Sequence, residues 1–206
     1  MSHTFALLVP VKTLTLAKSR LRTAQRDARA PLMRAFALDA IAAALHSLSV
    51  AQVYVVTEEP GFEVDGAIRL LDKGDGDLNR ALQHASLQAR LLDPPLGIAA
   101  MCADLPCLRP DDLDGALAAG MSPRWFVADA SGSGTTLLAA GPGVDLDPRF
   151  GAGSARRHEE SGATPVRGGL RTLRMDVDTE ADLDAAVQIG LGLNTTKALA
   201  SGRAPL

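Results

Sequence analysis

Carboxylates follow two expected strands close to the points where those strands end. Asp104 comes just after the apolar run 97–102, and Asp176 and Asp178 come at the end of the run 170–177. Residues i and i+2 of a strand point to the same face, and two carboxylates about 4 Å apart repel each other by roughly 4 kcal/mol at an effective dielectric constant near 20. Mg²⁺ relieves such repulsion and takes one or two carboxylates together with substrate phosphates. We therefore interpret Asp104, Asp176 and Asp178 as candidate Mg²⁺ ligands; the alternatives are that Asp104 caps a turn or helix and that Asp178 caps the next helix.

The segment that follows the first expected strand is polar and basic. It contains Lys12, Lys18 and Arg20. A lysine supplies a compact positive charge, and an arginine supplies a fork of donors that matches phosphate oxygens. These three side chains suit a polyphosphate, and the alternative is a basic loop that only contacts solvent.

Two segments rich in glycine and hydroxyl groups, 131–136 and 150–154, are candidate anion-binding loops. Glycine lets a ligand approach the backbone closely, and a helix that begins at Ser154 would point free N–H groups toward an anion. Neither segment is specific by itself, because glycine turns are common. Together with the basic loop and the three aspartates, they predict a site for a compact polyanion.

A polar segment, 72–79, precedes another expected helix. Asp77 or Asn79 could cap that helix through a side-chain oxygen. The alternative role for Asn79 is a hydrogen bond to the edge of a nucleotide base.

The sequence contains no motif for an enzymic nucleophile. There is no Gly-x-Ser-x-Gly, no P-loop, no His-Glu-x-x-His and no Cys-x-x-Cys, and we expect His158 to face solvent from a short charged helix. Nucleotidyl transfer fits this inventory, because the acceptor phosphate is already anionic at about pH 7 and attacks the α-phosphate of a nucleoside triphosphate without a general base. Catalysis then consists of positioning and charge neutralisation.

Composition excludes several other classes of protein. The chain has 206 residues, a net charge of −3 and only 3% aromatic residues, which argues against nucleic-acid binding. No apolar run reaches the roughly 18 residues of a membrane span, and the first ten residues lack a signal-peptide pattern. Cys102 and Cys107 are expected to be reduced. We therefore expect a cytoplasmic protein that binds neither nucleic acid nor membrane.

Apolar runs and helical patterns alternate along the chain, which predicts an α/β fold of three layers with a mostly parallel central sheet. Expected strands are 4–10, 51–57, 67–71, 97–102, 125–129, 135–140 and 170–177, and expected helices are 31–48, 77–92, 110–120, 154–161 and 179–190. The fifth and sixth strands form an inserted hairpin. We expect one domain over 1–190 and a loosely ordered tail over 191–206. Ligands of such sheets bind beyond the carboxyl ends of the strands.

Six motifs occur in an order that resembles the CofC/FbiD family. They are Val9-Pro-Val-Lys12 with Ala17-Lys-Ser-Arg-Leu21, Gly76-Asp-Leu-Asn-Arg-Ala-Leu82, Ala103-Asp-Leu-Pro106, Gly132-Ser-Gly-Thr-Thr-Leu137, Phe150-Gly-Ala-Gly-Ser154 with Arg157-His158, and Asp176-Val-Asp-Thr179. Members of this family are guanylyltransferases that act on 2-phospho-L-lactate or phosphoenolpyruvate in coenzyme F-420 biosynthesis. The resemblance extends to about Gly190.

The resemblance implies a nucleotidyltransferase fold (Rossmann-like), GTP as donor, Mg²⁺ as cofactor and a small phosphorylated carboxylic acid as acceptor. The implied acceptor-binding residues are Thr136, Gly151 and Ser154. The implied metal ligands are Asp104, Asp176 and Asp178, and the implied nucleotide-binding residues are Lys12, Lys18, Arg20 and Asn79. Lys12, Lys18 and Asp104 would carry catalysis.

The sequence leaves the acceptor open among phosphoenolpyruvate, 2-phospho-L-lactate and 3-phosphoglycerate. Its Ala- and Arg-rich composition favours phosphoenolpyruvate only weakly. The Pro10-Val-Lys12 step replaces the glycine-rich Arg-Met-Gly loop of the wider fingerprint, which disfavours molybdopterin or a sugar phosphate as acceptor. A non-catalytic nucleotide-binding protein is the remaining alternative, and the chain could be a monomer or a homodimer.

Overall fold

A computed structural model describes residues 4–11, 29–120 and 122–201. A seven-stranded sheet has the order β3-β2-β1-β4-β6-β5-β7. The strands are β1 (Phe5–Pro10), β2 (Val50–Thr57), β3 (Ala67–Leu71), β4 (Gly97–Met101), β5 (Arg124–Ala128), β6 (Thr135–Ala140) and β7 (Thr164–Pro165). The helices are α1 (Arg29–Leu45), α2 (Leu78–Leu92), α3 (Pro110–Ala118), α4 (Ser154–Glu160), α5 (Glu180–Ile189) and α6 (Leu193–Ser201).

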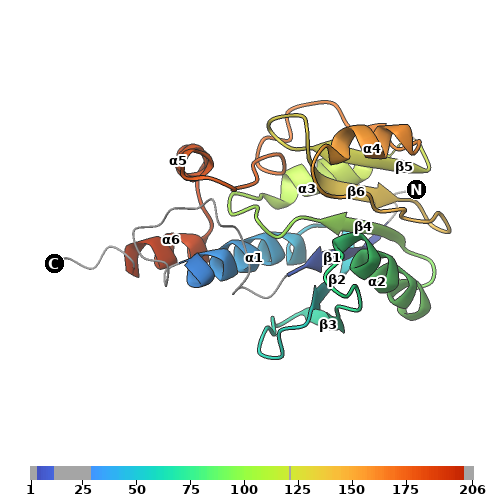
Figure 1. Cartoon of the computed structure of the whole chain (residues 1–206), viewed down its shortest axis with the longest axis horizontal. Helices are drawn as coiled ribbons and strands as arrows, with labels where there is room; N and C mark the ends of the chain where they lie inside the picture. The colour runs from blue at the N-terminus through green and yellow to red at the C-terminus, as the bar shows by residue number, and fades with distance from the viewer. Residues whose placement is uncertain (1–3, 12–28, 121, 202–206) are drawn as a thin grey trace.

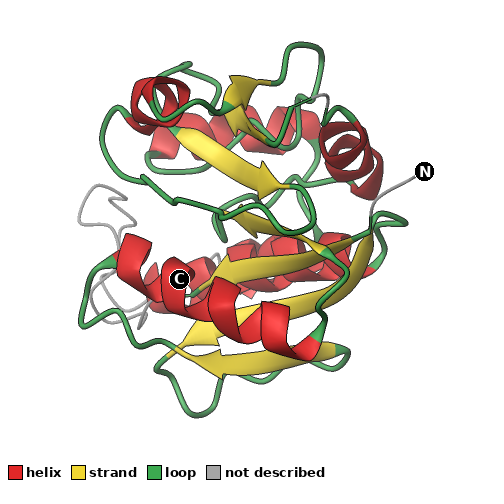
Figure 2. Ribbon diagram, turned by 90° about the vertical axis from the view of Figure 1, so that its right-hand side faces the viewer, coloured by secondary structure: helices red, strands yellow, loops and turns green. Residues whose placement is uncertain are grey.

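The predicted three-layer architecture is confirmed (Figures 1 and 2). Alternate residues of β1 enter two different cores because successive side chains point to opposite faces. Leu7 and Val9 pack on the side of α1 and α3, whereas Ala6 and Leu8 pack on the side of α2. The strand is buried on both faces, and this explains why its sequence is a continuous apolar run.

The predicted hairpin is confirmed as well. β1, β2, β3 and β4 pair in parallel, and β6 then pairs antiparallel with both β4 and β5. This reversal places the beginning of β6 beside the carboxyl end of β4, where Met101 pairs with Leu137. The loop that precedes β6 therefore lies at the sheet edge where parallel α/β proteins bind ligands.

The predicted strand over 170–177 is wrong. The chain there forms turns and an irregular segment, and the two-residue strand β7 pairs with β5 instead. Hydrogen bonds to side chains, rather than pairing with a neighbouring strand, fix this segment. Arg174 donates to the carbonyls of Ala128 and Val166, at 2.8 and 2.7 Å, and Asp112 accepts from both the backbone N–H and the hydroxyl of Thr172.

The C-terminal segment also differs from the expected loose tail. Residues 193–201 form helix α6, which packs with α1 and α5 around a third apolar cluster. The buried carboxylate of Asp39 in α1 accepts the backbone N–H groups of Asn194 and Thr195, at 2.9 and 2.8 Å, and so caps α6 from another helix. A Cβ on Gly192 would overlap the Asp39 carboxylate. The domain boundary at residue 190 stays a prediction.

Membrane insertion through a helix finds no support in the described residues. None of their helices is both long enough and apolar enough to cross a bilayer.

Candidate active site

The structure brings the three predicted aspartates together, although the segment that contains Asp176 and Asp178 is not the expected strand. Asp104 follows β4, and its carbonyl accepts the N–H of Val177 at 3.0 Å. This bond joins the end of β4 to the irregular segment that contains Asp176 and Asp178. Burial, followed by the charges of Asp104, Asp129 and Asp178, raises the pKa of Asp176 to about 7. The four carboxylates thus form one acidic group.

The helix ends exclude a helix-capping role for Asp178 and for Asp104, whereas the turn role of Asp104 stays an alternative. Thr179, not Asp178, caps α5, and it forms a capping box with Asp182. Arg109 occupies the cap position of α3, so Asp104 does not cap that helix.

Asp129 also belongs to the acidic group, and it was not among the residues predicted from the sequence. Its carboxylate accepts the backbone N–H groups of Ser133 and Gly134, at 3.0 and 2.8 Å, and the hydroxyl of Ser131 at 2.9 Å. It therefore shapes the loop between β5 and β6. Its position at the end of a strand, like that of Asp104, was the signal that could have identified it.

The donor set of the acidic group fits Mg²⁺. Within the described part of the chain, no three or more His, Cys, Asp or Glu side chains form a cage that could hold a metal ion. Mg²⁺ does not require such a cage, because it retains waters and binds substrate phosphates alongside one or two carboxylates. A cation would also offset the repulsion among the carboxylates around Asp176. The roles of Asp104, Asp176 and Asp178 as ligands stay predictions.

The two glycine-rich segments lie against each other. The N–H of Ala155 donates to the carbonyl of Ser133 at 3.2 Å. Gly151 and Gly153 have φ angles of 112° and 69°, a region that favours glycine. The side chain of Ser154 is buried at the start of α4.

Thr136 lies where the glycine-rich loop enters β6. Its carbonyl accepts the N–H of Cys102 at 2.9 Å, which ties it to the end of β4 two residues before Asp104. Its hydroxyl is buried and donates to the carbonyl of Val127 at 3.4 Å. Thr136, Gly151 and Ser154 therefore come from neighbouring segments, and their contact with an acceptor stays a prediction.

Asp77 and Asn79 have separate roles. Asp77 caps α2 by accepting the N–H groups of Asn79 and Arg80, at 2.8 and 3.2 Å. The carboxamide of Asn79 instead faces the backbone of Phe150, whose N–H it accepts at 2.7 Å and whose carbonyl it binds at 3.2 Å. Its contact with a nucleotide stays a prediction.

The expectation that His158 faces solvent is wrong. Its side chain is fully buried, and its ring meets Phe150 edge-on with centroids 5.1 Å apart. Nε2 accepts the N–H of Arg149 at 2.9 Å, so Nδ1 carries the proton and donates to the hydroxyl of Thr135 at 2.9 Å. Burial, together with nearby arginines, lowers the pKa of His158 to about 4. The sequence could not show this, because the partners come from three segments.

Lys12, Lys18 and Arg20 lie outside the described residues, so their roles stay predictions.

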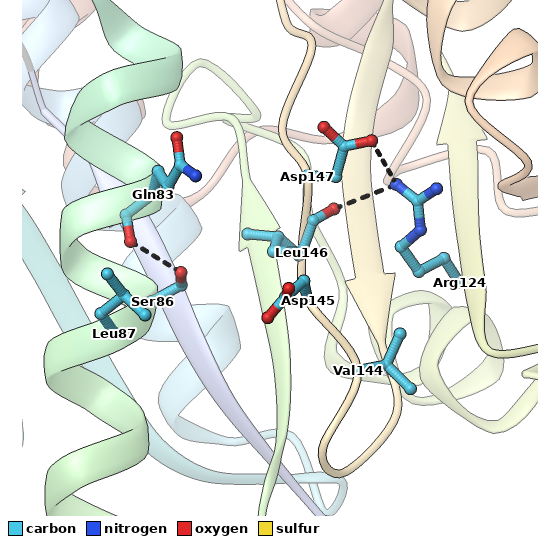
Figure 3. Close-up of a pocket in the computed structure, with 8 residues that line it drawn as sticks. All are labelled: Gln83, Ser86, Leu87, Arg124, Val144, Asp145, Leu146 and Asp147. Atoms are coloured by element: carbon cyan, nitrogen blue, oxygen red, sulfur yellow. Dashed lines mark hydrogen bonds and ion pairs between the residues drawn. The ribbon is translucent and has the colours of Figure 1, made fainter.

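Two hollows lie near these elements. One, of about 620 Å³, is lined by Ala130, Gly168 and Gly169 together with Arg171, Arg174 and Met175, and so adjoins Asp129 and Asp176 along the chain. The other, of about 480 Å³, lies between α2 and residues 144–147 (Figure 3). Its Arg124 is paired with Asp147 at 3.1 Å. No predicted site residue lines either hollow, and of the two only the first adjoins the acidic group along the chain.

Solved structures of low sequence identity show which fold the chain has. The chain resembles 4-diphosphocytidyl-2C-methyl-D-erythritol synthase from Anaerococcus prevotii, with a TM-score of 0.57 and 10% identity over 90% of this chain and 95% of that one. It also resembles CMP:2-keto-3-deoxy-manno-octonic acid synthetase, with a TM-score of 0.54 and 12% identity over 90% and 98% of the two chains. The fold is that of the nucleotidyltransferases.

Sequence comparison places the chain more narrowly. The family described as guanylyl transferase CofC like matches residues 5–200, and the chain belongs to this family of guanylyltransferases. A phosphoenolpyruvate guanylyltransferase from Streptomyces avermitilis is 47% identical over 95% of this chain and 94% of that protein. Another from Thermomonospora curvata is 46% identical over 93% of this chain and 87% of that protein.

Proposed function

We propose that this guanylyltransferase transfers GMP from GTP to the phosphate of phosphoenolpyruvate. A phosphate oxygen of the acid attacks the α-phosphorus of GTP, the bond between the α- and β-phosphates breaks, and pyrophosphate leaves. The product is enolpyruvoyl-2-diphospho-5'-guanosine. The names of the relatives from S. avermitilis and T. curvata support the choice of acceptor, and the family resemblance supports a place in coenzyme F-420 biosynthesis.

The observation that carries the proposal is the position of the acidic group beside the two glycine-rich segments. Asp104, Asp176 and Asp178 would hold Mg²⁺, which when bound neutralises phosphate charge and favours departure of pyrophosphate. Thr136 is bonded to the end of β4, and the segment of Gly151 and Ser154 is bonded to the loop that precedes Thr136, so the three residues could orient an acid next to the metal. Lys12, Lys18 and Arg20 would contact the phosphates of GTP.

The arrangement requires no side chain that removes a proton from the acceptor. The attacking phosphate is anionic at about pH 7. The buried His158 is held neutral by its surroundings and its ring nitrogens both have protein partners, so it fits a structural role better than that of a base. Rate acceleration would therefore come from orientation and charge neutralisation.

The test is pyrophosphate release with GTP and Mg²⁺, measured in parallel for phosphoenolpyruvate, 2-phospho-L-lactate and 3-phosphoglycerate, with ATP as donor control. We expect the greatest kcat/KM with GTP and phosphoenolpyruvate. A preference for another of the three acids would retain the reaction class and overturn the acceptor. Binding of GTP without turnover of any acid would overturn the proposed function.

A further inference from the structure

The chain just before Gly151 is held almost entirely by side chains. The N–H of Arg149 donates to Nε2 of His158 at 2.9 Å, and its carbonyl accepts from Nε of Arg157 at 3.2 Å. The N–H of Phe150 donates to Oδ1 of Asn79 at 2.7 Å. The carbonyl of Phe150 accepts from Nδ2 of Asn79 at 3.2 Å and from Nη2 of Arg157 at 2.9 Å. All four backbone polar groups of residues 149 and 150 therefore have side-chain partners.

These bonds determine where Gly151 lies. A loop without backbone pairing has no ladder to fix its path, so its side-chain partners take that role. Gly151 itself needs to be glycine, because its φ is 112° and a Cβ would lie 3.2 Å from Nη2 of Arg157. The positions of Gly151 and Ser154 are consequently coupled to the residues that hold 149 and 150.

Asn79 belongs to a different part of the chain from the other two side-chain partners of residues 149 and 150. Arg157 and His158 belong to α4, which directly follows the loop, whereas Asn79 lies in α2, 71 residues away from Phe150. Helix α2 is fixed to the parallel half of the sheet, since Ala81 and Leu82 share an apolar core with Leu8 of β1. The carboxamide thus connects the loop before Gly151 to the central strands.

Contacts at the start of α2 support this connection. Asp77 caps the first turn, and Gly74 is packed so closely that a Cβ there would overlap the carbonyl of Asp77 and the side chain of Ala81. Asn79 is half-buried in that first turn. Its carboxamide therefore presents one acceptor and one donor from the start of α2, and these match the backbone N–H and carbonyl of Phe150.

We propose that Asn79 is a positioning residue for the acceptor-binding segment 150–154. The inference rests on the proposed function for the identity of the acceptor. It reassigns the residue from the nucleotide, where the sequence pattern had it, to the loop that would contact the phosphorylated acid. Removal of the carboxamide should therefore weaken binding of the acid and leave binding of GTP intact.

The kinetic test compares Asn79→Ala with Arg80→Ala, a matched control in the same helical turn whose exposed side chain pairs only with Asp75 in the described interactions. We expect Asn79→Ala to raise the KM for phosphoenolpyruvate about tenfold and to change the KM for GTP less than about twofold. A selective rise in the KM for GTP, or no change in either KM, would overturn the proposal.

Asn79→Asp is a second variant of the same shape. Its carboxylate still accepts the N–H of Phe150 but repels the carbonyl, so we expect a rise in the KM for the acid that lies between the wild type and Asn79→Ala. This variant keeps the proposal testable if Asn79→Ala does not fold.

Amide hydrogen exchange of the free protein separates this proposal from the proposed function. We expect amides of residues 149–153 to exchange about tenfold faster in Asn79→Ala than in the wild type and in Arg80→Ala. Unchanged exchange would overturn the positioning role even if the enzyme is active. A wild-type protein that turns over none of the three acids would overturn the proposed function, and the exchange result would still decide the role of Asn79 in the loop.

Discussion

The buried His158 makes stability depend on pH in a defined direction. Its pKa falls from 6.5 to about 4 on folding, chiefly because of burial and then because of Arg157, Arg124 and Arg149, while Asp147 acts in the opposite sense. The unfolded chain therefore takes up a proton on this residue at a higher pH than the folded chain does. The contribution to stability is fully present above pH 6.5 and decreases as the pH falls toward about 4.

The size of this effect follows from the shift. One pKa unit corresponds to about 1.4 kcal/mol, so the full shift is worth about 3 kcal/mol, and protonation would also break the bond from the N–H of Arg149 to Nε2. Other acidic groups titrate in the same range. Their effect cancels when the wild type is compared with His158→Gln at each pH, because both proteins contain them.

The assay is urea unfolding at several pH values between about 4 and 7.5. We expect His158→Gln to be less stable than the wild type at pH 7.5, since it loses ring packing and hydrogen bonds. The stability difference should shrink by about 3 kcal/mol as the pH falls to 4. His84→Gln, which removes an exposed histidine from α2, is the matched control for loss of an imidazole. A difference between wild type and His158→Gln that stays constant over this range would show that His158 does not titrate below its ordinary pKa in the folded protein.

Two further predictions concern the acidic group and the C-terminal helix. Asp104→Asn should reduce pyrophosphate release on the order of a hundredfold or more, whereas Asp111→Asn, in the exposed first turn of α3, should leave the rate nearly unchanged; equal rates would remove Asp104 from the site. Gly192→Ala should lower the free energy of unfolding by about 2 kcal/mol, because its Cβ would overlap Asp39. Gly169→Ala, where a Cβ meets nothing within 4 Å, should change it by less than about 0.5 kcal/mol in the same denaturant titration.

The central strands and the hairpin could be predicted because their signals are local. Buried parallel strands have continuous apolar runs, and the glycine-rich stretch 130–134 marks the turn between β5 and β6. The segment 170–177 has buried apolar residues at the alternate positions 173, 175 and 177, as a strand would, but it lacks a strand partner, and Arg174 and Thr172 bind other groups. An apolar pattern indicates that side chains are buried, but it does not indicate whether the backbone pairs with a neighbouring strand.

Apart from Asp129, the missed features depend on pairs of residues that are distant in sequence. Helix α6 is capped by Asp39, 155 residues before Asn194, and no local pattern around 193–201 reports that carboxylate. Asn79 meets Phe150 over 71 residues. Candidate residues of the right chemical type could be found from the sequence, whereas their interaction partners could be identified only from the folded structure.

The reversal of chain direction at β6 places the proposed acceptor-binding residues in a stretch of sequence separate from the parallel strands. The carboxyl ends of β1 and β4 belong to the parallel strands, whereas Thr136 and Gly151 come after the hairpin turn has begun. Residues 129–155 can therefore diverge while the pairing of β1, β2 and β4 is retained. If Thr136, Gly151 and Ser154 contact the acid as proposed, exchange of that stretch between relatives that retain Asn79 should transfer the preference for an acid without changing the choice of nucleotide.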